Sequence, residues 1–405
     1  MRRRLQFAPI AIFLFVFALL NAYVTEGLRL VVPYYVLAIF WSVVVVVTLA
    51  LAGSIFYSRG RELGTAFKIS AHAFLVLLVS ELLFAVVLLF GDVYRLLAGT
   101  VHLIGNHRFL APVRNPYWVD FGLVLFGLSV LLFVYGMLRG KYAYRVIHHT
   151  LHFNDLPKAF DGFTITQISD VHAGSFKNQA AVQRGIDLIK QQDSDLFVFT
   201  GDLVNNKAEE IKPWIGHFSQ IKARYGQFSV LGNHDYGDYV KWPSEEAKRA
   251  NLAQLKKYHA ELGFRLLLDE HVTLQKEGEH IILAGIENWG LGFGERGDLQ
   301  KALEQTTTTE FKVLLSHDPS HWEQQVKNNP SKIQLTLAGH THGMQFGIEA
   351  FGIKWSPVKF RYNHWAGIKA ENGRYLNVNR GFGFIGFSGR VGIWPEVTVI
   401  TLKRA

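Results

Sequence analysis

Four long apolar stretches near the N-terminus limit what this chain can fold into more than any other feature of its sequence. They cover residues 5–24, 30–56, 71–90 and 118–138 of the 405 residues. A helix needs about 18–20 apolar residues to cross the roughly 30 Å hydrocarbon core of a bilayer, and each stretch reaches that length. The β-branched run 43–47 would favour a strand in water, but an isolated strand in lipid leaves its backbone groups unpaired. We therefore predict a membrane domain of four transmembrane helices in residues 1–145.

The first stretch follows Met1-Arg2-Arg3-Arg4 and could also be a signal peptide. Its apolar run is longer than the roughly 7–15 residues of a signal-peptide core, and three more stretches follow, so a retained helix is favoured.

The short loops between the stretches carry positive charge unequally. Nine basic residues fall on the side of the N-terminus: Arg2, Arg3, Arg4, Arg59, Arg61, Lys68, Arg139, Lys141 and Arg145. Four fall on the other side: Arg29, Arg95, Arg108 and Arg114. Lysine and arginine accumulate in cytoplasmic loops, which predicts a cytoplasmic N-terminus. Four spans return the chain to the same side, so residues 146–405 are expected on the cytoplasmic face of an inner or plasma membrane. In the long third loop, Val93–Ile104 is a candidate interfacial amphipathic helix.

One ionisable residue, Glu81, falls in the middle of the third stretch. Such a residue is a functional candidate by default. No second charge lies at a similar depth in the sequence pattern, so a carboxyl that is protonated or bonded to a neighbouring helix is favoured over a transport role.

Charge and cysteine content exclude several classes of protein. The net charge is +9, but residues 1–145 hold 13 basic and 5 acidic residues, whereas residues 146–405 hold 29 and 28. The basic excess therefore flanks the apolar stretches, and a nucleic-acid patch is not supported. The chain contains no cysteine, which excludes disulfides, zinc fingers, iron–sulfur clusters and a thiol nucleophile. Any metal must bind to His, Asp, Glu or Asn.

From about residue 146 the sequence changes to an α/β pattern, in which short apolar runs alternate with charged amphipathic segments and turns. Strands are expected at residues 163–169, 196–200, 228–231, 280–284, 312–315 and 334–337, and helices at 179–191, 209–223 and 244–262. Residues 146–405 suffice for one large domain. Histidines in its charged or amphipathic segments, such as His259, are expected on the surface.

Five of these strands run directly into residues of metal-binding type. The five ends read Asp170-Val171-His172, Gly201-Asp202, Gly232-Asn233-His234-Asp235, Ser316-His317-Asp318 and Gly339-His340-Thr341-His342. A single Asp or His after a strand is usually a cap or turn residue, but five such ends by coincidence are implausible. Sites in open α/β sheets form beyond the carboxyl ends of the strands, so the five ends are expected to meet in one crevice.

The donor types indicate the metal chemistry. Asp-x-His and His-x-His place alternate side chains on the same side of an extended segment, so both can face one centre. Two carboxylates, four histidines and one Asn exceed what one ion needs, and they suit two ions with a bridging carboxylate. Imidazole mixed with oxygen donors favours Mn, Fe, Zn or Co over Mg or Ca, with Mn the first choice. Two such ions can hold a hydroxide and clamp the attacking and leaving oxygens of a phosphoryl group.

In this order, the five ends resemble the motifs of the calcineurin-like metallophosphoesterases, and the resemblance extends from about residue 160 to the C-terminus. It is closest to the membrane-associated branch, which includes the UDP-2,3-diacylglucosamine pyrophosphatases. The resemblance implies a four-layer α/β/β/α sandwich with a dinuclear metal centre, following the multi-span helical membrane region.

The resemblance also implies a role for each site residue. One metal would bind to Asp170, His172, Asp202 and His342, and the other to Asp202, Asn233, His317 and His340, with Asp202 as the bridge. His234 would give a hydrogen bond or a proton to the phosphate or the leaving oxygen, and Asp235 would orient His234 or its loop. The chain departs from the family at Asn205, where Asp is frequent, and at Met344, where Gly is frequent. Neither is an expected ligand, so the departures concern the pocket rim.

Two segments rich in Phe, Trp and Gly, residues 344–365 and 381–394, bear on the substrate. They could form an apolar lip toward the bilayer in which Arg361, Arg380 and Arg390 grip phosphate, or they could be tightly packed β-hairpins. The sequence favours neither reading.

Three functions fit the pattern. The favoured one is a membrane-tethered two-metal phosphoesterase that cleaves a phosphoester or pyrophosphate bond of a lipid-linked substrate. The second is the same catalyst acting on a soluble nucleotide or phosphoprotein. The third is a non-enzymatic sensor or transporter whose cytosolic domain binds metal, which the presence of His234 disfavours. The sequence indicates the bilayer as a partner, no nucleic acid, and no particular protein partner.

Overall fold

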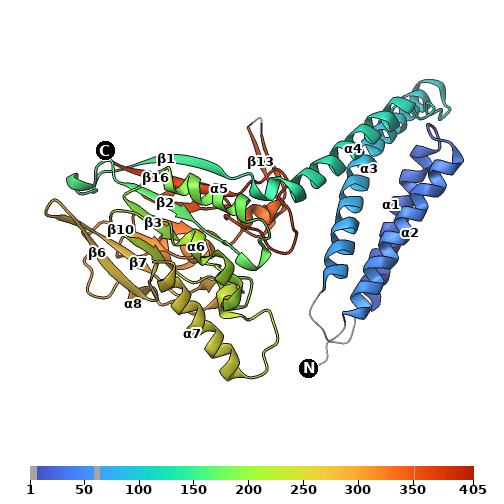
Figure 1. Cartoon of the computed structure of the whole chain (residues 1–405). Coiled ribbons are helices and arrows are strands. Elements are labelled where there is room, and N and C mark those ends of the chain that lie inside the picture. Colours follow the sequence, from blue (N-terminus) through green and yellow to red (C-terminus); the bar gives the residue numbers. More distant parts are fainter. Residues whose placement is uncertain (1–6, 59–63, 351) are drawn as a thin grey trace. The chain divides into compact units, whose positions relative to one another are not determined.

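The computed structural model describes residues 7–58, 64–350 and 352–405 (Figure 1). The chain divides into two compact units, Met1–Tyr135 and Gly136–Ala405. Of the sequence features interpreted above, the start of the first apolar stretch, the arginines at positions 2–4, and Arg59 and Arg61 lie outside the described residues.

Four long helices account for the N-terminal apolar stretches. They are α1 (Phe7–Leu28), α2 (Tyr34–Tyr57), α3 (Thr65–Asn106) and α4 (Pro116–Leu138). All four are long and apolar enough to cross a membrane. The β-branched run 43–47 lies inside α2, as expected for a segment that must pair its own backbone groups. The prediction of four apolar helices is confirmed.

The helix α3 is longer than the third predicted span. It contains 42 residues and no proline, and it ends at Asn106, just before His107, whose backbone is left-handed. The segment Val93–Ile104, expected as a separate interfacial helix, continues α3 instead because no helix-breaking residue precedes it. At 1.5 Å per residue α3 is about 63 Å long.

Two polar features of the first unit are a network around Asp92 and the buried acid Glu81. Asp92 of α3 accepts hydrogen bonds from Tyr23 (2.8 Å), from Arg95 (2.8 Å) and from Nε of Arg114 (3.0 Å). This network joins α1, α3 and the segment before α4. Glu81 is fully buried, and neither carboxyl oxygen has a hydrogen-bond partner in the described ranges. The expected alternative of a bond from Glu81 to a neighbouring helix is therefore not observed there.

The second unit contains two six-stranded sheets. The first has the order β1 (Arg145–Phe153), β16 (Glu396–Arg404), β2 (Thr164–Ile168), β3 (Leu196–Phe199), β4 (Gln227–Ser229), β5 (Arg265–Leu266). The second has the order β14 (Gly367–Glu371), β15 (Arg374–Val378), β11 (Leu335–Ala338), β10 (Lys312–Leu315), β7 (Glu279–Gly285), β6 (Glu270–Lys276). Strands β2 to β5 are parallel, as are β15, β11, β10 and β7. Two short antiparallel pairs, β8 (Trp289–Gly290) with β9 (Gly294–Glu295) and β12 (Ile348–Ala350) with β13 (Ile353–Trp355), stand apart from the sheets.

Alternation along the strands divides the core into layers. Leu196 and Val198 belong to the apolar cluster between the two sheets, whereas Phe197 and Phe199 belong to a cluster on the outer face of the first sheet. In the second sheet, Leu314 likewise points away from the cluster that its strand neighbours join. This period of two is the geometry of a strand buried on both faces.

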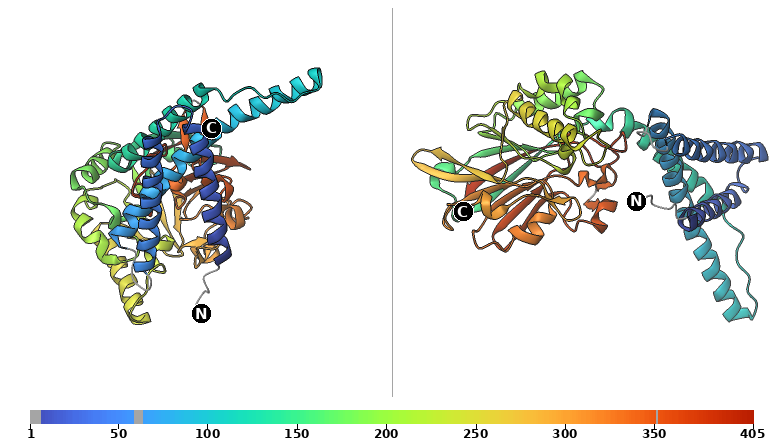
Figure 2. Two further views of the ribbon diagram at one scale, coloured as in Figure 1. Left: turned by 90° about the vertical axis from the view of Figure 1, so that its right-hand side faces the viewer. Right: turned by 90° about the horizontal axis from the view of Figure 1, so that it is seen from below.

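Helices cover both outer faces. The first sheet is covered by α5 (Gln179–Lys190), α6 (Ile215–Phe218) and α7 (Glu245–Glu261), and the second by α8 (Leu299–Ala302) and the π-helix η6 (Trp322–Val326). In the right-hand view of Figure 2, the green and yellow helices lie on one side of the sheets and the orange helical segments on the other. The predicted four-layer α/β/β/α sandwich is confirmed.

One predicted helix is wrong. Residues 209–223 form the 3₁₀-helix η4 (Ala208–Trp214) followed by the four-residue α6. Pro213 lies inside this segment, lacks a backbone N–H and disfavours an α conformation in the residue before it, so a continuous α-helix cannot form.

The surface position expected for His259 is also wrong. This residue of α7 is completely buried, and its Nδ1 lies 2.9 Å from the Ser229 hydroxyl. Helical spacing turns it toward the sheet beside Leu255 and Tyr258. Burial disfavours the charged imidazolium and lowers the pKa of His259 to about 3.

This buried histidine predicts a loss of stability in acid. The unfolded chain binds a proton at His259 below about pH 6.5, while the folded chain binds it only near pH 3. Between these values stability therefore falls as the pH falls, by up to about 1.4 kcal/mol per pH unit. We expect His259→Gln to lose less stability than the parent when unfolding is compared at pH 7.5 and pH 5. Equal losses in the two proteins would contradict the assignment.

Candidate metal centre

The five strand ends singled out in the sequence meet at the carboxyl edges of the two sheets. Strands β2, β3 and β4 deliver their ends from the first sheet, and β10 and β11 deliver theirs from the second. Parallel strands within each sheet bring these ends to one edge. The candidate metal-binding side chains of all five strand ends are buried or nearly so.

The backbone at these ends is unusual. Asp170, His172, Asp202, His340 and His342 all have left-handed backbones, with φ between 46° and 70°. Such a conformation costs roughly 1–3 kcal/mol for a residue with a side chain, and it persists where surrounding structure requires it. Gly339, just before His340, has no room for a side chain, because a Cβ would lie 1.9 Å from the Ser169 hydroxyl. The ends of β2 and β11 are thus closely packed at this point.

The first cluster contains Asp170, His172 and His342, whose ligand atoms all lie within 4.8 Å of one another. Nε2 of His172 is 3.0 Å from Nε2 of His342, which is 3.2 Å from Oδ1 of Asp170. Asp170 and His172 follow β2 and His342 follows β11, so the cluster joins the two sheets.

The second cluster contains Asp202, His317 and His340, also within 4.8 Å of one another. Nε2 of His317 lies 3.2 Å from Oδ2 of Asp202 and 3.3 Å from Nδ1 of His340. The side-chain oxygen of Asn233 is 2.8 Å from the same His340 nitrogen. All four side chains direct a donor atom toward one small volume.

Asp202 lies between the two clusters. Its Oδ2 is 3.2 Å from Nε2 of His317 in the second cluster and 3.5 Å from Nε2 of His172 in the first. Its other oxygen accepts a hydrogen bond from the backbone N–H of His234 at 2.8 Å. One carboxylate therefore connects both groups of donors.

The electrostatics of the clusters fit divalent cations. At a separation of 3.0 Å, Nε2 of His172 and Nε2 of His342 either share one proton in a hydrogen bond or direct two lone pairs at a cation. Burial opposes ionisation of Asp202, but the neighbouring His317 outweighs it and holds the pKa of Asp202 well below its usual range. Burial likewise lowers the pKa of His317, yet Asp202 outweighs this and raises it to about 10. A positive charge beside Asp202 is therefore favourable, and the mixture of carboxylates and imidazoles suits Mn, Fe, Zn or Co.

His234 lies beside the clusters with one nitrogen fixed. Its Nδ1 is 2.8 Å from the backbone oxygen of Asn205, and because a carbonyl only accepts, Nδ1 carries a proton there. This leaves Nε2 available. The ring lies edge-on to His172 at 5.0 Å and packs against Tyr239 at 4.4 Å. Since the contact with His234 uses the backbone oxygen of residue 205, it does not require the Asp side chain that is frequent at this position in the family.

Asp235 holds the backbone of the site. It is fully buried and accepts hydrogen bonds from the N–H groups of Gly232 (2.9 Å), Asp202 (2.9 Å), Leu203 (2.8 Å) and Val204 (3.2 Å). Burial, and then the charge of Asp202, raise the pKa of Asp235 to about 7. Its carboxyl group faces these loops and not the imidazole of His234, so of the two roles expected for Asp235 the geometry fits the orientation of the loop.

Sequence reasoning missed two residues that position His340. Oδ2 of Asp318 lies 3.3 Å from Nε2 of His340 and accepts a hydrogen bond from the Tyr362 hydroxyl at 3.0 Å. A carboxylate at Nε2 favours a proton there and turns the Nδ1 lone pair toward the second cluster. Asp318 stands at one of the five strand ends, which was the available signal. Tyr362 is 44 residues away in sequence and carried none.

The three arginines considered as phosphate ligands differ in environment. Arg380 is buried and paired with Glu349 and Glu396. Arg390 is completely buried, and its guanidinium donates to the backbone oxygens of residues 380, 381 and 383. Arg361 is exposed and donates to the backbone oxygen of Leu291 at 3.1 Å. Of the three, Arg361 alone is open to a ligand from solvent.

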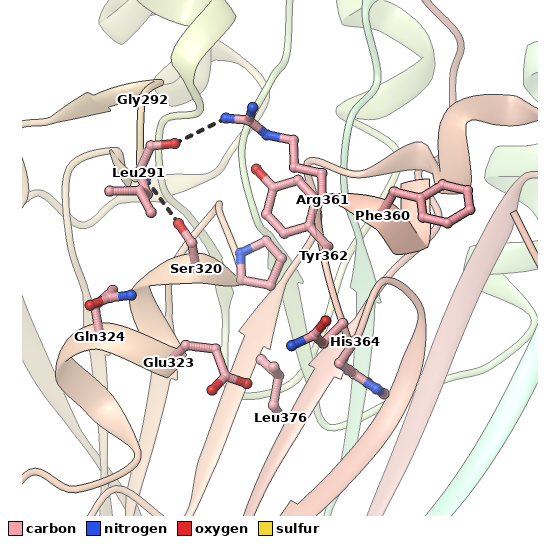
Figure 3. A pocket seen from close by; sticks show the side chains of 12 residues that line it. Leu291, Gly292, Ser320, Glu323, Gln324, Phe360, Arg361, Tyr362, His364 and Leu376 are labelled. Carbon is pink, nitrogen blue, oxygen red and sulfur yellow. Dashed lines mark hydrogen bonds between the residues drawn. The ribbon is translucent and has the colours of Figure 1, made fainter. Parts of the chain in front are cut away.

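A cavity of about 840 Å³ adjoins the second cluster through one of its lining residues, Tyr362, while none of the candidate ligands lines it. Figure 3 shows Phe360, Arg361 and Tyr362 on one side of it and Leu291 opposite, with the Arg361–Leu291 hydrogen bond crossing between them. Tyr362 also packs against the ring of His340 at 5.7 Å, so one wall of the cavity touches the candidate metal centre.

A four-layer sandwich with two His/Asp clusters at the carboxyl edges of its sheets defines a metal-dependent hydrolase. Residues 163–344 match the family described as "Calcineurin-like phosphoesterase", and residues 3–141 match "Probable Calcineurin-like phosphoesterase, transmembrane domain". The chain belongs to the calcineurin-like phosphoesterases and is a phosphoester hydrolase with an N-terminal four-helix membrane domain. The family implies divalent metal ions, and the two clusters provide candidate ligands for them.

Similar proteins come from bacteria and animals. The "Uncharacterized metallophosphoesterase YkuE" of Bacillus subtilis (strain 168) is 29% identical over 258 residues, which are 63% of this chain and 84% of that protein. The "Transmembrane protein with metallophosphoesterase domain" of Danio rerio is 27% identical over 289 residues, 69% of this chain and 62% of that protein. An "Uncharacterized metallophosphoesterase" of Aquifex aeolicus (strain VF5) is 28% identical over 280 residues, 68% of this chain and 98% of that protein.

The contact between Asp318 and His340 predicts an effect on metal affinity. We expect Asp318→Asn to weaken metal binding about 10- to 100-fold, because Asn no longer fixes the proton of His340 at Nε2. Isothermal titration of the metal-stripped chain with Mn²⁺ measures this. Glu277→Gln, at an exposed turn, serves as the matched control. Unchanged affinity in Asp318→Asn would remove Asp318 from the site.

Proposed function

We propose that this chain hydrolyses a phosphoester or pyrophosphate bond of a lipid-linked substrate at a dinuclear centre on the cytoplasmic face of the membrane. The observation that carries the proposal is the position of Asp202, whose Oδ2 lies within 3.5 Å of a histidine in each cluster. A carboxylate shared in this way is suited to bridge two ions.

In this proposal, one ion binds to Asp170, His172, Asp202 and His342, and the other to Asp202, Asn233, His317 and His340. Mn²⁺ is the preferred ion, with Fe, Zn and Co also compatible with these donors. Two divalent ions bound there would supply Lewis-acid charge to a phosphoryl group and lower the pKa of water. The six clustered donors and the adjacent Asn233 oxygen support this assignment.

The chain's own residues contribute proton transfer and positioning. With Nδ1 of His234 bonded to the Asn205 oxygen, a proton on Nε2 can pass to the leaving oxygen of the substrate, a step typically worth about 10²–10⁴ in rate. Asp235 keeps the loop that carries Asp202 in place through its backbone contacts. Asp318 and Tyr362 keep Nδ1 of His340 directed at the ligand volume.

Two observations support a lipid-linked substrate. The same chain carries four apolar helices long enough to span a membrane. The cavity beside the second cluster has apolar residues at its entrance, Leu291 and Phe360, together with the exposed cation of Arg361. An anionic amphiphile, such as the UDP-2,3-diacylglucosamine type of molecule suggested by the resemblance, matches this combination. The polar residues Ser320 and Asn363 in the same cavity favour the second candidate, a soluble nucleotide or phosphoprotein.

His234→Ala tests the catalytic assignment. In detergent-purified protein with Mn²⁺, we expect hydrolysis of bis-p-nitrophenyl phosphate to fall by about 10²–10⁴ while bound metal, measured by mass spectrometry, stays unchanged. His280→Ala, which changes an exposed histidine at the start of β7, is the control and should retain the parent rate. A wild-type rate in His234→Ala would reject the proton-transfer role.

Incubation with a total membrane lipid extract tests the substrate. We expect the parent chain to consume a phosphorylated lipid and release its headgroup, and His234→Ala to spare it, as followed by mass spectrometry. If every lipid remains while bis-p-nitrophenyl phosphate is still cleaved, the lipid-linked substrate is wrong and a soluble substrate replaces it.

The cytoplasmic orientation can be tested because the chain has no cysteine of its own. We expect a single cysteine introduced as Glu277→Cys to react with a membrane-impermeant maleimide only after cells are permeabilised. Labelling of intact cells would place the hydrolase domain on the opposite face.

A further inference from the structure

Large apolar side chains are exposed at few places in the hydrolase domain. Among its described residues from position 140 onward, six are exposed: Tyr239 (50%), Leu291 (54%), Met344 (57%), Ile348 (50%), Ile353 (56%) and Phe360 (81%). Isolated exposed apolar residues need no explanation, but four of these six fall between positions 344 and 360. We call Leu291, Met344, Ile348, Ile353 and Phe360 the apolar rim.

The segment that carries the rim begins and ends at the candidate metal centre. It leaves the ligand His342 at Gly343 and returns at Tyr362, which contacts Asp318 and His340. The hydroxyl of Ser356 donates to the backbone oxygen of Gly343 at 2.7 Å and closes the segment at its base. Leu291 joins the rim from another loop through the hydrogen bond from Arg361. The rim therefore borders the site.

The β12–β13 hairpin within this segment has one apolar and one charged face. Ile348 pairs with Trp355, Ala350 with Ile353, and Glu349 with Lys354. Because opposite residues in an antiparallel pair share a face, the first two pairs lie together and the Glu349–Lys354 pair lies on the other side. Glu349 bonds to the buried Arg380, and Lys354 lies 5.1 Å from the ring of Trp365, so the charged face turns toward the domain. The apolar face points outward, and Figure 1 shows the hairpin at the β13 label projecting from the domain.

Cations accompany the exposed apolar residues. Lys359 lies 5.6 Å from the ring of Phe360, and Arg361 follows directly. Both Lys359 and Arg361 are exposed, whereas Lys354 lies with Glu349 on the face turned toward the domain. Apolar side chains interspersed with lysine and arginine are the composition of segments that dip into a headgroup layer, where anionic lipids attract the cations.

We propose that the apolar rim is a membrane-contacting surface, which inserts Ile348, Ile353 and Phe360 into the headgroup layer of an anionic bilayer. The surface delivers a lipid-linked substrate sideways from the bilayer into the cavity beside the second cluster, since Leu291 and Phe360 line that cavity. The partner is a lipid surface because the chain itself carries four candidate membrane spans and the rim cations complement anionic headgroups. The route for substrate rests on the proposed function, whereas the insertion does not.

Single cysteines in this cysteine-free chain test the insertion. The full chain carrying Ile348→Cys or Ile353→Cys is labelled with a fluorophore sensitive to polarity and reconstituted, one copy per nanodisc, in phosphatidylcholine with phosphatidylglycerol. Lipids with a nitroxide at a shallow acyl position quench a fluorophore that enters the bilayer. Glu277→Cys is the control, since it precedes β7 and the carboxyl end of that strand is the one nearest the site.

We expect blue-shifted emission and loss of fluorescence to nitroxide lipids at positions 348 and 353, and neither effect at 277. Emission at 348 and 353 that matches position 277 would overturn the proposal. A blue shift without quenching would also overturn it, because it would show a protein and not a lipid covering the rim.

Activity separates this proposal from the proposed function. We expect the double variant Ile348→Ser/Ile353→Ser to hydrolyse bis-p-nitrophenyl phosphate at the parent rate but to lose activity on the membrane lipid extract. If the labels are quenched and no lipid is hydrolysed by any variant, the insertion holds and the lipid-linked substrate fails. If lipid is hydrolysed equally by parent and double variant while the labels stay unquenched, the substrate holds and the rim proposal fails.

Discussion

The arrangement of this hydrolase domain depends on one carboxylate. Asp202 follows β3 with a left-handed backbone, receives the His234 N–H on one oxygen, and presents the other to a histidine of each cluster. These contacts require the edges of both sheets to stand at a fixed separation, which the apolar cluster between the sheets provides. Asp235 adds the local constraint by holding the loop after Asp202 through backbone N–H groups. The geometry of the site therefore depends directly on the packing of the core.

Much of the site could be predicted because its signal is local. A buried strand followed by Asp-x-His or His-x-His can be recognised from a few residues, and the membrane helices can be predicted from length and hydropathy. Contacts between segments that are distant in sequence could not be predicted in this way. Tyr362 bonds to Asp318, which lies 44 residues away in sequence. His259 is buried against a sheet, and the sequence of its own helix does not indicate this contact. At residues 209–223 the charged pattern is typical of a helix, but Pro213 within it prevents a continuous α-helix.

Two segments of similar composition have opposite environments, which explains why composition alone favoured neither reading. Residues 381–394 are largely buried, with Phe382 and Arg390 inside the domain. Residues 344–360 instead expose Met344, Ile348, Ile353 and Phe360. The two segments differ in their partners. The guanidinium of Arg390 donates to the backbone oxygens of Gly381 and Gly383 in its own segment and of the preceding Arg380, whereas Arg361 donates to one oxygen of a separate loop. Aromatic and glycine content predicts tight turns in both, but which surface they face is set by the rest of the fold.

Both clusters take donors from both sheets, since β2, β3 and β4 belong to one and β10 and β11 to the other. Ions bound there would cross-link the two sheets, which the apolar core between them already holds together. The same ligand atoms would then serve both the hydrolysis and the stability of the domain. Any change of ligand would therefore alter how firmly the two sheets are held together as well as the rate of hydrolysis.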